Sequence, residues 1–201
     1  FESLLGKSNA KTIQDAVLYW IAETHFKGSN FSKAAEFYGR IVNEFPESTY
    51  RASSYYSLGW CFSQLGKWKE ALDNFIIVET QFKNDPLAED AIFKIVECLY
   101  NLKEYQSLKD RLKGYLKEFS NDTVKQSYLY FYLAEAEYYS GNFSQALEYY
   151  AKVLKGSDDD KIQALSRLGA GWSYLKLKRY KEAESEFSAL KEESLDKKGV
   201  E

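Results

Sequence analysis

Apolar, aromatic and small residues return along this chain at an almost constant interval. The best-formed copy of the pattern reads Tyr55-x2-Leu58-Gly59-x2-Phe62 and then Ala71-x3-Phe75. The position of Gly59 is occupied in turn by Ala22, Gly59, Val96, Ala134 and Gly171, at spacings of 37, 37, 38 and 37 residues. Apolar positions three and four residues apart indicate helices. A repeat of this length indicates stacked pairs of helices, because one pair cannot bury its apolar face alone.

The pattern therefore predicts an all-α solenoid of about five helical hairpins. The second helix of each hairpin carries the register of Ala71, occupied by Ala34, Ala71, Leu108, Ala146 and Ala183. We expect one domain over residues 1–201, with repeats at about residues 15–48, 52–85, 89–122, 127–160 and 164–197. Residues 1–14 are expected to be the remnant of a preceding repeat, because Phe1 and Leu4 fall at the registers of Tyr38 and Ile41.

Capping residues precede repeats 2 to 5. A side-chain oxygen at the start of a helix can accept from the open N–H groups of the first turn. The residues at the matching positions are Ser48, Asp85, Asp122 and Asp160. We expect each of them to cap the first helix of its repeat.

Taken together, these residues resemble the tetratricopeptide repeat (TPR), whose signature is W-x2-L-G-x2-Y…A-x3-F…P. The resemblance covers about residues 15–197. Repeats 2 and 5 match best, whereas repeat 3 departs most, with Val96 and Leu108 at the two small positions. The resemblance implies a right-handed α-α superhelix of stacked hairpins, a fold whose members bind other proteins and bring no chemistry of their own.

Composition narrows the class of partner. The chain has 201 residues, of which 45% are hydrophobic, and 27 basic residues against 30 acidic ones give a net charge of −3. Nucleic-acid binding is not expected, because it needs a strongly basic stripe. No apolar run approaches the roughly 20 residues of a membrane span. Aromatic residues reach 17%, which is enough to cover a core and to leave rings for a ligand.

The sequence offers no constellation for catalysis, metal binding or a cofactor, so we do not expect an enzyme. His25 is the single histidine and falls at the register of Phe62 and Tyr174, a packing position. Cys61 and Cys98 share one register in adjacent repeats. Equivalent points on packed helices lie roughly 9–10 Å apart, whereas a disulfide needs Cα atoms within about 7 Å. We therefore predict two free, mostly buried thiols.

In the family that the chain resembles, the first helix of each hairpin lines a concave side, and its fifth, ninth and twelfth positions touch ligands. The resemblance therefore implies a peptide-binding groove. Its residues are Tyr19, Glu23, Phe26, Tyr56, Trp60, Phe93, Glu97, Tyr100, Phe131, Glu135, Tyr138, Leu168 and Trp172. We interpret the chain as a protein–protein interaction scaffold that binds a peptide segment or partner protein in this aromatic and acidic groove. The carboxylates of Glu23, Glu97 and Glu135 would suit a partner with Lys, Arg or a free amine.

Other interpretations of the same residues stay open. The aromatic residues of the predicted groove also fit a buried core. The chain could instead be a structural spacer or a self-associating, homo-oligomeric array within a larger repeat protein, or a glycan-binding module. The junction Phe45-Pro46-Glu47-Ser48 is similar to bacterial envelope members such as the outer-membrane β-barrel assembly lipoprotein and the Tol–Pal-associated periplasmic protein. This resemblance implies a periplasmic or outer-membrane-associated location, with the cytoplasm as the alternative.

Overall fold

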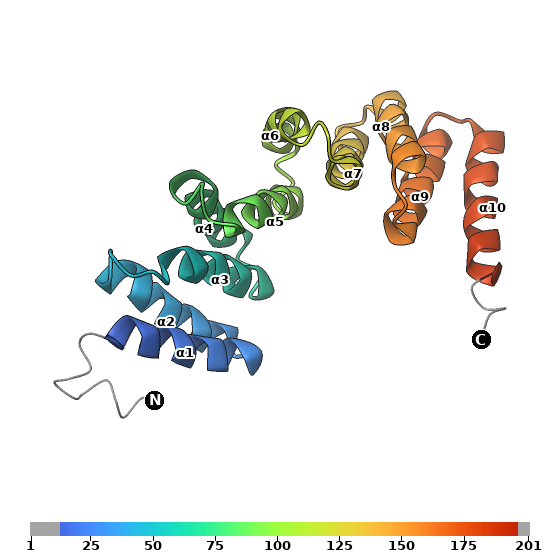
Figure 1. The fold of residues 1–201 in the computed structure, drawn as a ribbon. Coiled ribbons are helices and arrows are strands. Elements are labelled where there is room, and N and C mark those ends of the chain that lie inside the picture. Colours follow the sequence, from blue (N-terminus) through green and yellow to red (C-terminus); the bar gives the residue numbers. More distant parts are fainter. Residues whose placement is uncertain (1–12, 197–201) are drawn as a thin grey trace. The chain divides into compact units, whose positions relative to one another are not determined.

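The structure, a computed structural model, describes residues 13–196 and their side chains up to residue 190. It confirms the all-α repeat fold over this range (Figure 1). The described residues form ten helices and no strand: α1 (Gln14–Lys27), α2 (Phe31–Glu44), α3 (Arg51–Gln64), α4 (Trp68–Gln81), α5 (Leu87–Asn101), α6 (Tyr105–Glu118), α7 (Thr123–Tyr139), α8 (Phe143–Gly156), α9 (Asp160–Lys176) and α10 (Tyr180–Asp196). The first twelve residues of the predicted remnant of a preceding repeat lie outside the described residues.

The chain divides into two compact units, Phe1–Leu102 and Lys103–Glu201. Unit 1 contains α1 to α5, and unit 2 contains α6 to α10. The division falls in the turn between α5 and α6, inside the third predicted repeat. One continuous domain over residues 1–201 therefore stays a prediction.

In unit 1, each helix packs against the next one along the chain, and α3 also contacts α5 (Figure 1). The core between α1, α2 and α3 includes Leu18, Ala34, Tyr38 and Ile41, all of which are fully buried. Partly buried aromatic side chains surround this cluster. The first helices of the hairpins thus share one side of the unit, as the repeat pattern predicts.

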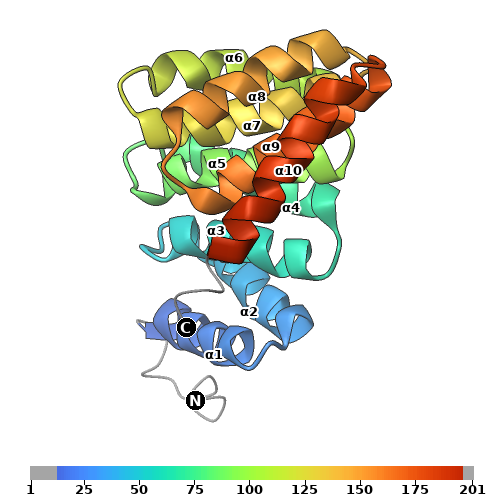
Figure 2. The ribbon, with the colours of Figure 1, turned by 90° about the vertical axis from the view of Figure 1, so that its right-hand side faces the viewer.

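Unit 2 is built in the same way. Helices α6 to α10 pack in chain order, α7 also contacts α9, and α8, α9 and α10 lie side by side in both views (Figures 1 and 2). Its core holds Ala134, Ala146 and Tyr150, which are fully buried, together with Ala170. Tyr150 from the second helix of one hairpin lies between two first helices, so a single aromatic residue ties consecutive repeats together.

The two helices of a hairpin approach closely where the first helix carries a small residue. A Cβ atom added to Gly59 would lie 2.6 Å from the ring of Phe75, and one added to Gly171 would lie 2.4 Å from the ring of Phe187. Such distances are well inside van der Waals contact, so a side chain at these positions would force the ring away. The signature glycine is therefore required by the aromatic ring of the second helix.

The turn inside every hairpin also has one shared conformation. A residue with positive φ stands at one register in all five turns: Ser29, Gly66, Lys103, Gly141 and Lys178. Its φ lies between 57° and 81°. Glycine adopts this region without strain, whereas other residues do so at a cost of roughly 1–2 kcal/mol. The repeat thus fixes the turn geometry even where the sequence supplies no glycine.

Helix capping agrees with the prediction at α7 and differs by one residue at α9. The Asp122 carboxylate accepts a hydrogen bond from the Lys125 N–H at 3.0 Å. At α9 the cap is Asp159, and the prediction of Asp160 was wrong. Asp159 accepts from the Lys161 N–H at 2.8 Å, which starts the helix at Asp160 itself. The predictions of Ser48 and Asp85 were also wrong, because the N-cap positions of α3 and α5 are Tyr50 and Pro86. Ser48 and Asp85 lie in the preceding turns, where they accept from the amides of Tyr50 and Leu87.

The prediction of two free, buried thiols is confirmed. Cys61 and Cys98 are unpaired, with exposed fractions of 0% and 1%. Burial raises the pKa of each thiol to about 12. Both side chains therefore act as small apolar core residues of unit 1.

We expect Gly59→Ala to lower the free energy of unfolding by about 1–3 kcal/mol, because the new methyl group overpacks the contact with Phe75. Gly39→Ala is the matched control, since Gly39 is also helical and a Cβ atom there meets nothing within 4 Å. The control should be neutral or stabilising by up to about 1 kcal/mol. Urea unfolding followed by far-UV circular dichroism measures both. Equal effects of the two substitutions would contradict the close contact.

Neither thiol should react with a disulfide reagent such as DTNB in the native protein at pH 8. With a pKa of about 12, only about one thiol in ten thousand is ionised at that pH. Both thiols should react promptly once the chain is unfolded in urea. Rapid labelling of one or both in the native state would show that this part of unit 1 is more open than described.

Candidate functional site

The predicted groove residues lie on the first helices of the hairpins, at spacings of four and three residues that put them on one side of each helix. We call this side the inner face of each unit. In unit 1 it consists of Tyr19, Glu23, Phe26, Tyr56, Trp60, Phe93, Glu97 and Tyr100 on α1, α3 and α5. In unit 2 it consists of Phe131, Glu135, Tyr138, Leu168 and Trp172 on α7 and α9. Eleven of the thirteen side chains are half-buried, and only Leu168 and Trp172 are exposed.

Two inner-face carboxylates are bound from within the chain. The hydroxyl of Tyr38 donates a hydrogen bond to Glu23, and that of Tyr150 donates to Glu135, each across fifteen residues. Both tyrosines are fully buried. Burial raises the pKa of the Tyr38 phenol far above its ordinary value, and the bond to Glu23 raises it further. A buried hydroxyl needs such a partner, so these two carboxylates serve the fold directly.

Repeats 2 and 5 replace this polar pair by an apolar one. Phe75 and Phe187 occupy the register of the two tyrosines, and Trp60 and Trp172 stand fifteen residues before them. The rings of Trp172 and Phe187 meet edge to face, with centroids 5.9 Å apart. Because phenylalanine has no hydroxyl to satisfy, the inner-face position no longer needs a carboxylate. Sequence reasoning missed this pairing, although the sequence shows that tyrosine at the first register is accompanied by glutamate at the second, and phenylalanine by tryptophan.

The third inner-face carboxylate, Glu97, is held by a lysine that the sequence analysis did not single out. Leu112 occupies the aromatic register in this repeat and offers no donor. Instead, Lys94 Nζ donates to both oxygens of Glu97, at 2.8 and 3.0 Å. The same ammonium lies 4.2 Å from the centre of the Trp60 ring, a cation–π geometry. The chain's own lysine thus takes the place that a basic ligand would occupy between Trp60 and Glu97.

Most inner-face aromatics also pack inside their own unit. Tyr19 stacks on Tyr50 with ring centroids 4.6 Å apart. Tyr56 meets Phe75 edge to face at 5.5 Å, and burial raises the pKa of the Tyr56 phenol. In unit 2, Phe131 and Tyr138 pack against the buried cluster around Tyr150. These rings line the inner face with half-covered apolar surface and do not project from it.

Three exposed apolar side chains of unit 2 lie together on α9. Leu165, Leu168 and Trp172 are 40%, 41% and 49% exposed. Their spacing of three and four residues puts them on one face of the helix. We call these three residues the α9 apolar stripe. Leu165 was missing from the predicted site, although it lies on the same helix face three residues before Leu168.

Other chemistry is not evident in the described part of the chain. Between residues 13 and 196, no group of three or more His, Cys, Asp or Glu side chains is placed to hold a metal ion. Over the same residues, no helix combines the length and apolar character needed to cross a membrane. His25 stacks on Phe37, with ring centroids 5.6 Å apart, which is the packing role that its register predicts.

Comparison with known families identifies two segments of the chain as tetratricopeptide repeats. Residues 16–48 match one model of this repeat, and residues 132–194 match a second. The first segment lies in unit 1 and the second in unit 2. No curated protein sequence matches the chain.

Solved structures share the fold at low sequence identity. A MamA protein is 17% identical with a TM-score of 0.75, over 94% of this chain and 97% of that chain. MamA from Desulfovibrio magneticus RS-1 is 16% identical with a TM-score of 0.71, over 89% and 93%. YrrB, described as a TPR protein with an unusual peptide-binding site, is 18% identical with a TM-score of 0.64, over 92% and 91%. These similarities establish the fold.

Removing the hydroxyl in Tyr38→Phe should lower the free energy of unfolding by about 1.5–3 kcal/mol, the usual range for a hydrogen bond to a charged group. The converse substitution, Phe75→Tyr, should also destabilise, because the indole of Trp60 is a donor only and cannot accept from the new hydroxyl. Urea unfolding measures both. A neutral Tyr38→Phe would show that the bond to Glu23 does not stabilise unit 1.

Proposed function

We propose that this chain of tetratricopeptide repeats is a protein–protein interaction scaffold that holds a segment of a partner protein against its inner face. The α9 apolar stripe is the observation that carries the proposal. Its three large apolar side chains stay 40–49% exposed on one helix face, whereas the small residues Ala170, Gly171 and Ala183 of the same repeat are buried. Exposed apolar patches on soluble proteins are typical of interaction sites.

The surroundings of the stripe suit an extended or helical peptide segment. Helix α9 contacts α7, whose inner-face residues Phe131 and Tyr138 add half-buried aromatic surface beside the stripe. Trp172 supplies the residue type that most often dominates binding energy at interfaces. A segment that inserts leucine-sized or aromatic side chains between these rings would bury apolar area without breaking any ion pair of the chain.

Similarity of fold supports the proposal in general terms. YrrB, which shares the fold over 92% of this chain, is described as having a peptide-binding site. The common architecture offers the same kind of surface here, made from the first helices of successive hairpins. The residues that line it are this chain's own, and we propose the α9 stripe as their centre.

The partner's chemistry follows from the bonds that the inner face already makes. A preference for Lys or Arg was predicted from Glu23, Glu97 and Glu135. Each of these carboxylates is engaged by a side chain of the same unit. A basic ligand would have to displace Lys94 or compete with a tyrosine hydroxyl. We therefore propose that apolar anchors provide the affinity and that basic residues of the partner are secondary.

We also propose the bacterial envelope as the location, on the resemblance of the junction Phe45-Pro46-Glu47-Ser48 alone. The junction forms a tight turn, in which the Ser48 N–H donates to the Phe45 carbonyl at 3.1 Å. Cell fractionation with an antibody against the chain tests this proposal, and a purely cytoplasmic signal would contradict it.

The double variant Leu165→Ser with Leu168→Ser should lose partner binding while staying folded, because both side chains are exposed. We expect at least a tenfold rise in Kd for the partner segment, since two apolar anchors are removed. The partner is first captured from cell extracts with the wild-type chain and identified by mass spectrometry, and its affinity is then measured with purified components. Ala151→Ser is the matched control, because Ala151 is exposed on α8, the second helix of its hairpin, and so lies off the inner face.

Equal affinity of the double variant and the control would contradict the proposed site. Retention of glycan fragments in place of a protein, with loss of binding in Trp172→Ala, would favour the glycan-binding alternative. Capture of further copies of this chain by an immobilised copy would favour the self-associating array.

A further inference from the structure

Lys94 lies in a place that is built for a cation. Its ammonium donates to both oxygens of Glu97, at 2.8 and 3.0 Å, and lies 4.2 Å from the centre of the Trp60 ring. An aromatic face beside a carboxylate is a typical surrounding of a bound cation in proteins. The lysine and glutamate side chains are 20% and 33% exposed, so a partner can reach the pair from solvent.

The Trp60 ring is held in place from its own helix. Tyr56 stands one turn before it on α3, and the Tyr56 hydroxyl is hydrogen-bonded to the Trp60 side chain. Tyr56 in turn packs edge to face against Phe75, with ring centroids 5.5 Å apart. The position of the indole therefore does not depend on Lys94.

Lys94 has a second carboxylate within reach, that of Asp90. Asp90 is exposed and stands four residues before Lys94 on α5, and an acidic residue four positions before a lysine is the favourable order of a helix pair. Burial raises the pKa of the Tyr56 phenol, and the carboxylates of Asp90 and Glu97 raise it further, so both lie near this ring. The two carboxylates thus border one part of the inner face, and Lys94 can pair with either.

The charges of α5 favour the entry of one more cation. The helix carries three carboxylates, Glu89, Asp90 and Glu97, against Lys94 as its single basic residue. If Lys94 moves to Asp90, a partner's cation can take its place between Glu97 and Trp60. Every charge in this exchange stays paired, which is the condition for a charged contact on a half-buried surface.

Arginine suits this place better than lysine does. Its guanidinium group is planar, so it can stack on an indole ring and donate two parallel hydrogen bonds to one carboxylate. The ammonium of a lysine is a compact charge that offers only the contacts that Lys94 already makes. A partner's lysine would therefore replace one ammonium by another, whereas an arginine gains a stacking contact.

We propose that Trp60 and Glu97 form an arginine subsite of the inner face, which Lys94 closes in the free chain and opens by moving to Asp90. This inference rests on the proposed function, because it takes the inner face as the surface that receives the partner segment. It names arginine as the basic residue that unit 1 admits beside the apolar anchors of the partner. Lys94 thereby determines which cation is accepted.

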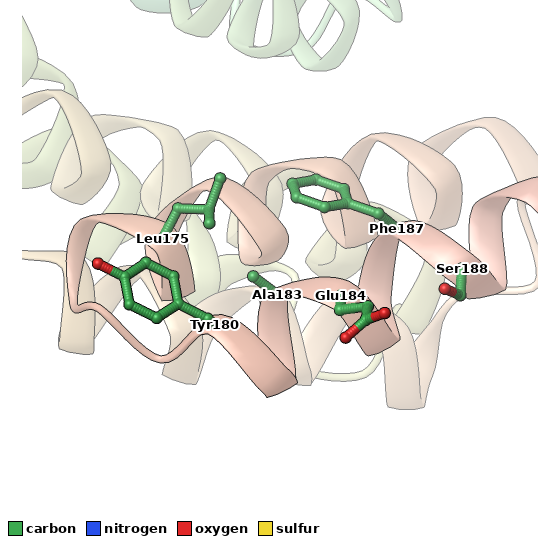
Figure 3. A pocket seen from close by; sticks show the side chains of 6 residues that line it. All are labelled: Leu175, Tyr180, Ala183, Glu184, Phe187 and Ser188. Carbon is green, nitrogen blue, oxygen red and sulfur yellow. The ribbon is translucent and has the colours of Figure 1, made fainter.

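A shallow pocket of unit 2 supplies a control, because it also holds a carboxylate among aromatic rings. The pocket has a volume of about 370 Å³ and is lined by six residues, none of them basic: Leu175, Tyr180, Ala183, Glu184, Phe187 and Ser188 (Figure 3). Glu184 lies between Tyr180 and Phe187 along α10 (Figure 3). An arginine attracted only by a carboxylate near rings would bind here as well, so Glu184→Gln is matched to Glu97→Gln.

The probe is the capped tripeptide acetyl-Gly-Arg-Gly-amide, compared with peptides that carry lysine or the neutral isostere citrulline in place of arginine. Each peptide is titrated into the whole chain labelled with nitrogen-15. The indole N–H signal of Trp60, assigned with Trp60→Phe, reports binding and gives Kd. Lys94→Met removes the ammonium and keeps a long side chain. Lys69→Met is its matched control, because Lys69 is an exposed lysine of α4 that pairs with Asp73.

We expect Lys94→Met to bind the arginine peptide about three- to tenfold more tightly than the wild type does, because the competing ammonium is gone. Lys69→Met should bind it as the wild type does. In Lys94→Met, the lysine peptide should bind more weakly than the arginine peptide, and the citrulline peptide should not bind. Glu97→Gln should lose the arginine peptide, whereas Glu184→Gln should leave the Trp60 signal and the Kd unchanged.

Asp90→Asn tests the movement of Lys94. The substitution removes the second partner of the lysine, so it should weaken binding of the arginine peptide about twofold when Lys94 is present. It should have little effect in Lys94→Met, where there is no ammonium to receive. Equal weakening in both backgrounds would overturn the movement, because Asp90 would then act on the peptide directly.

Two further results would overturn the subsite. One is equal affinity of the arginine peptide for the wild type, Lys94→Met and Lys69→Met, which includes binding to none of them. The other is equal affinity of the arginine and citrulline peptides. The variant Leu165→Ser with Leu168→Ser should bind the arginine peptide as the wild type does. A failure of the α9 apolar stripe would leave these titrations unchanged, so the subsite and the proposed function can fail separately.

Discussion

The close contact between the two helices of a hairpin, made by α1–α2 and α3–α4 in unit 1 and by α7–α8 and α9–α10 in unit 2, is the constraint on which the rest of the structure depends. A small residue in the first helix, such as Gly59 or Gly171, lets an aromatic ring of the second helix lie against its backbone. That ring then reaches the first helix of the following repeat, as Tyr150 reaches Gly169. The same few residues therefore hold the two helices of a hairpin together and hold consecutive repeats together. Long-range order within each unit follows from contacts between near neighbours in the sequence.

The chemistry of the inner face follows from this packing. Where the ring is a tyrosine, its buried hydroxyl requires an acceptor, and a glutamate of the first helix supplies it, as for Tyr38 with Glu23. Where the ring is a phenylalanine, the acceptor is unnecessary and a tryptophan takes the position, as for Phe187 with Trp172. The inner face is thus apolar at this position in repeats 2 and 5. Binding capacity is expected to concentrate in repeats of the second kind, and the exposed stripe on α9 belongs to one of them.

The fold could be predicted from the sequence because helices, turns and small-residue contacts are all encoded within one repeat, and each repeat confirms the others. The site could be predicted only as a list of positions. The repeat register shows that Glu23 and Glu97 occupy equivalent positions on α1 and α5, but it does not show that Tyr38 and Lys94 hold them, because those partners come from other registers. The exposed fraction of each side chain could not be predicted from the sequence either. Leu168 and Trp172 are large apolar residues of a first helix, as are Phe131 and Tyr138, and only the packing of α7, α8 and α9 leaves the first two exposed and the others half-buried. The cap at α9 was misplaced by one residue, since three consecutive aspartates offer the same oxygen acceptors to the open N–H groups at the helix start.

The central claim, that a partner segment rests on the α9 apolar stripe, is tested most directly by site-specific photo-crosslinking. A photoreactive phenylalanine derivative is placed at Leu168 in one sample and at Ala151, an exposed residue of α8 that is equally part of unit 2 but off the inner face, in another. After irradiation with the captured partner, mass spectrometry maps the adducts. Adducts from position 168 on one continuous apolar segment of the partner, with none from position 151, are the predicted result. Adducts from position 151 alone would contradict the claim and place the partner on another surface.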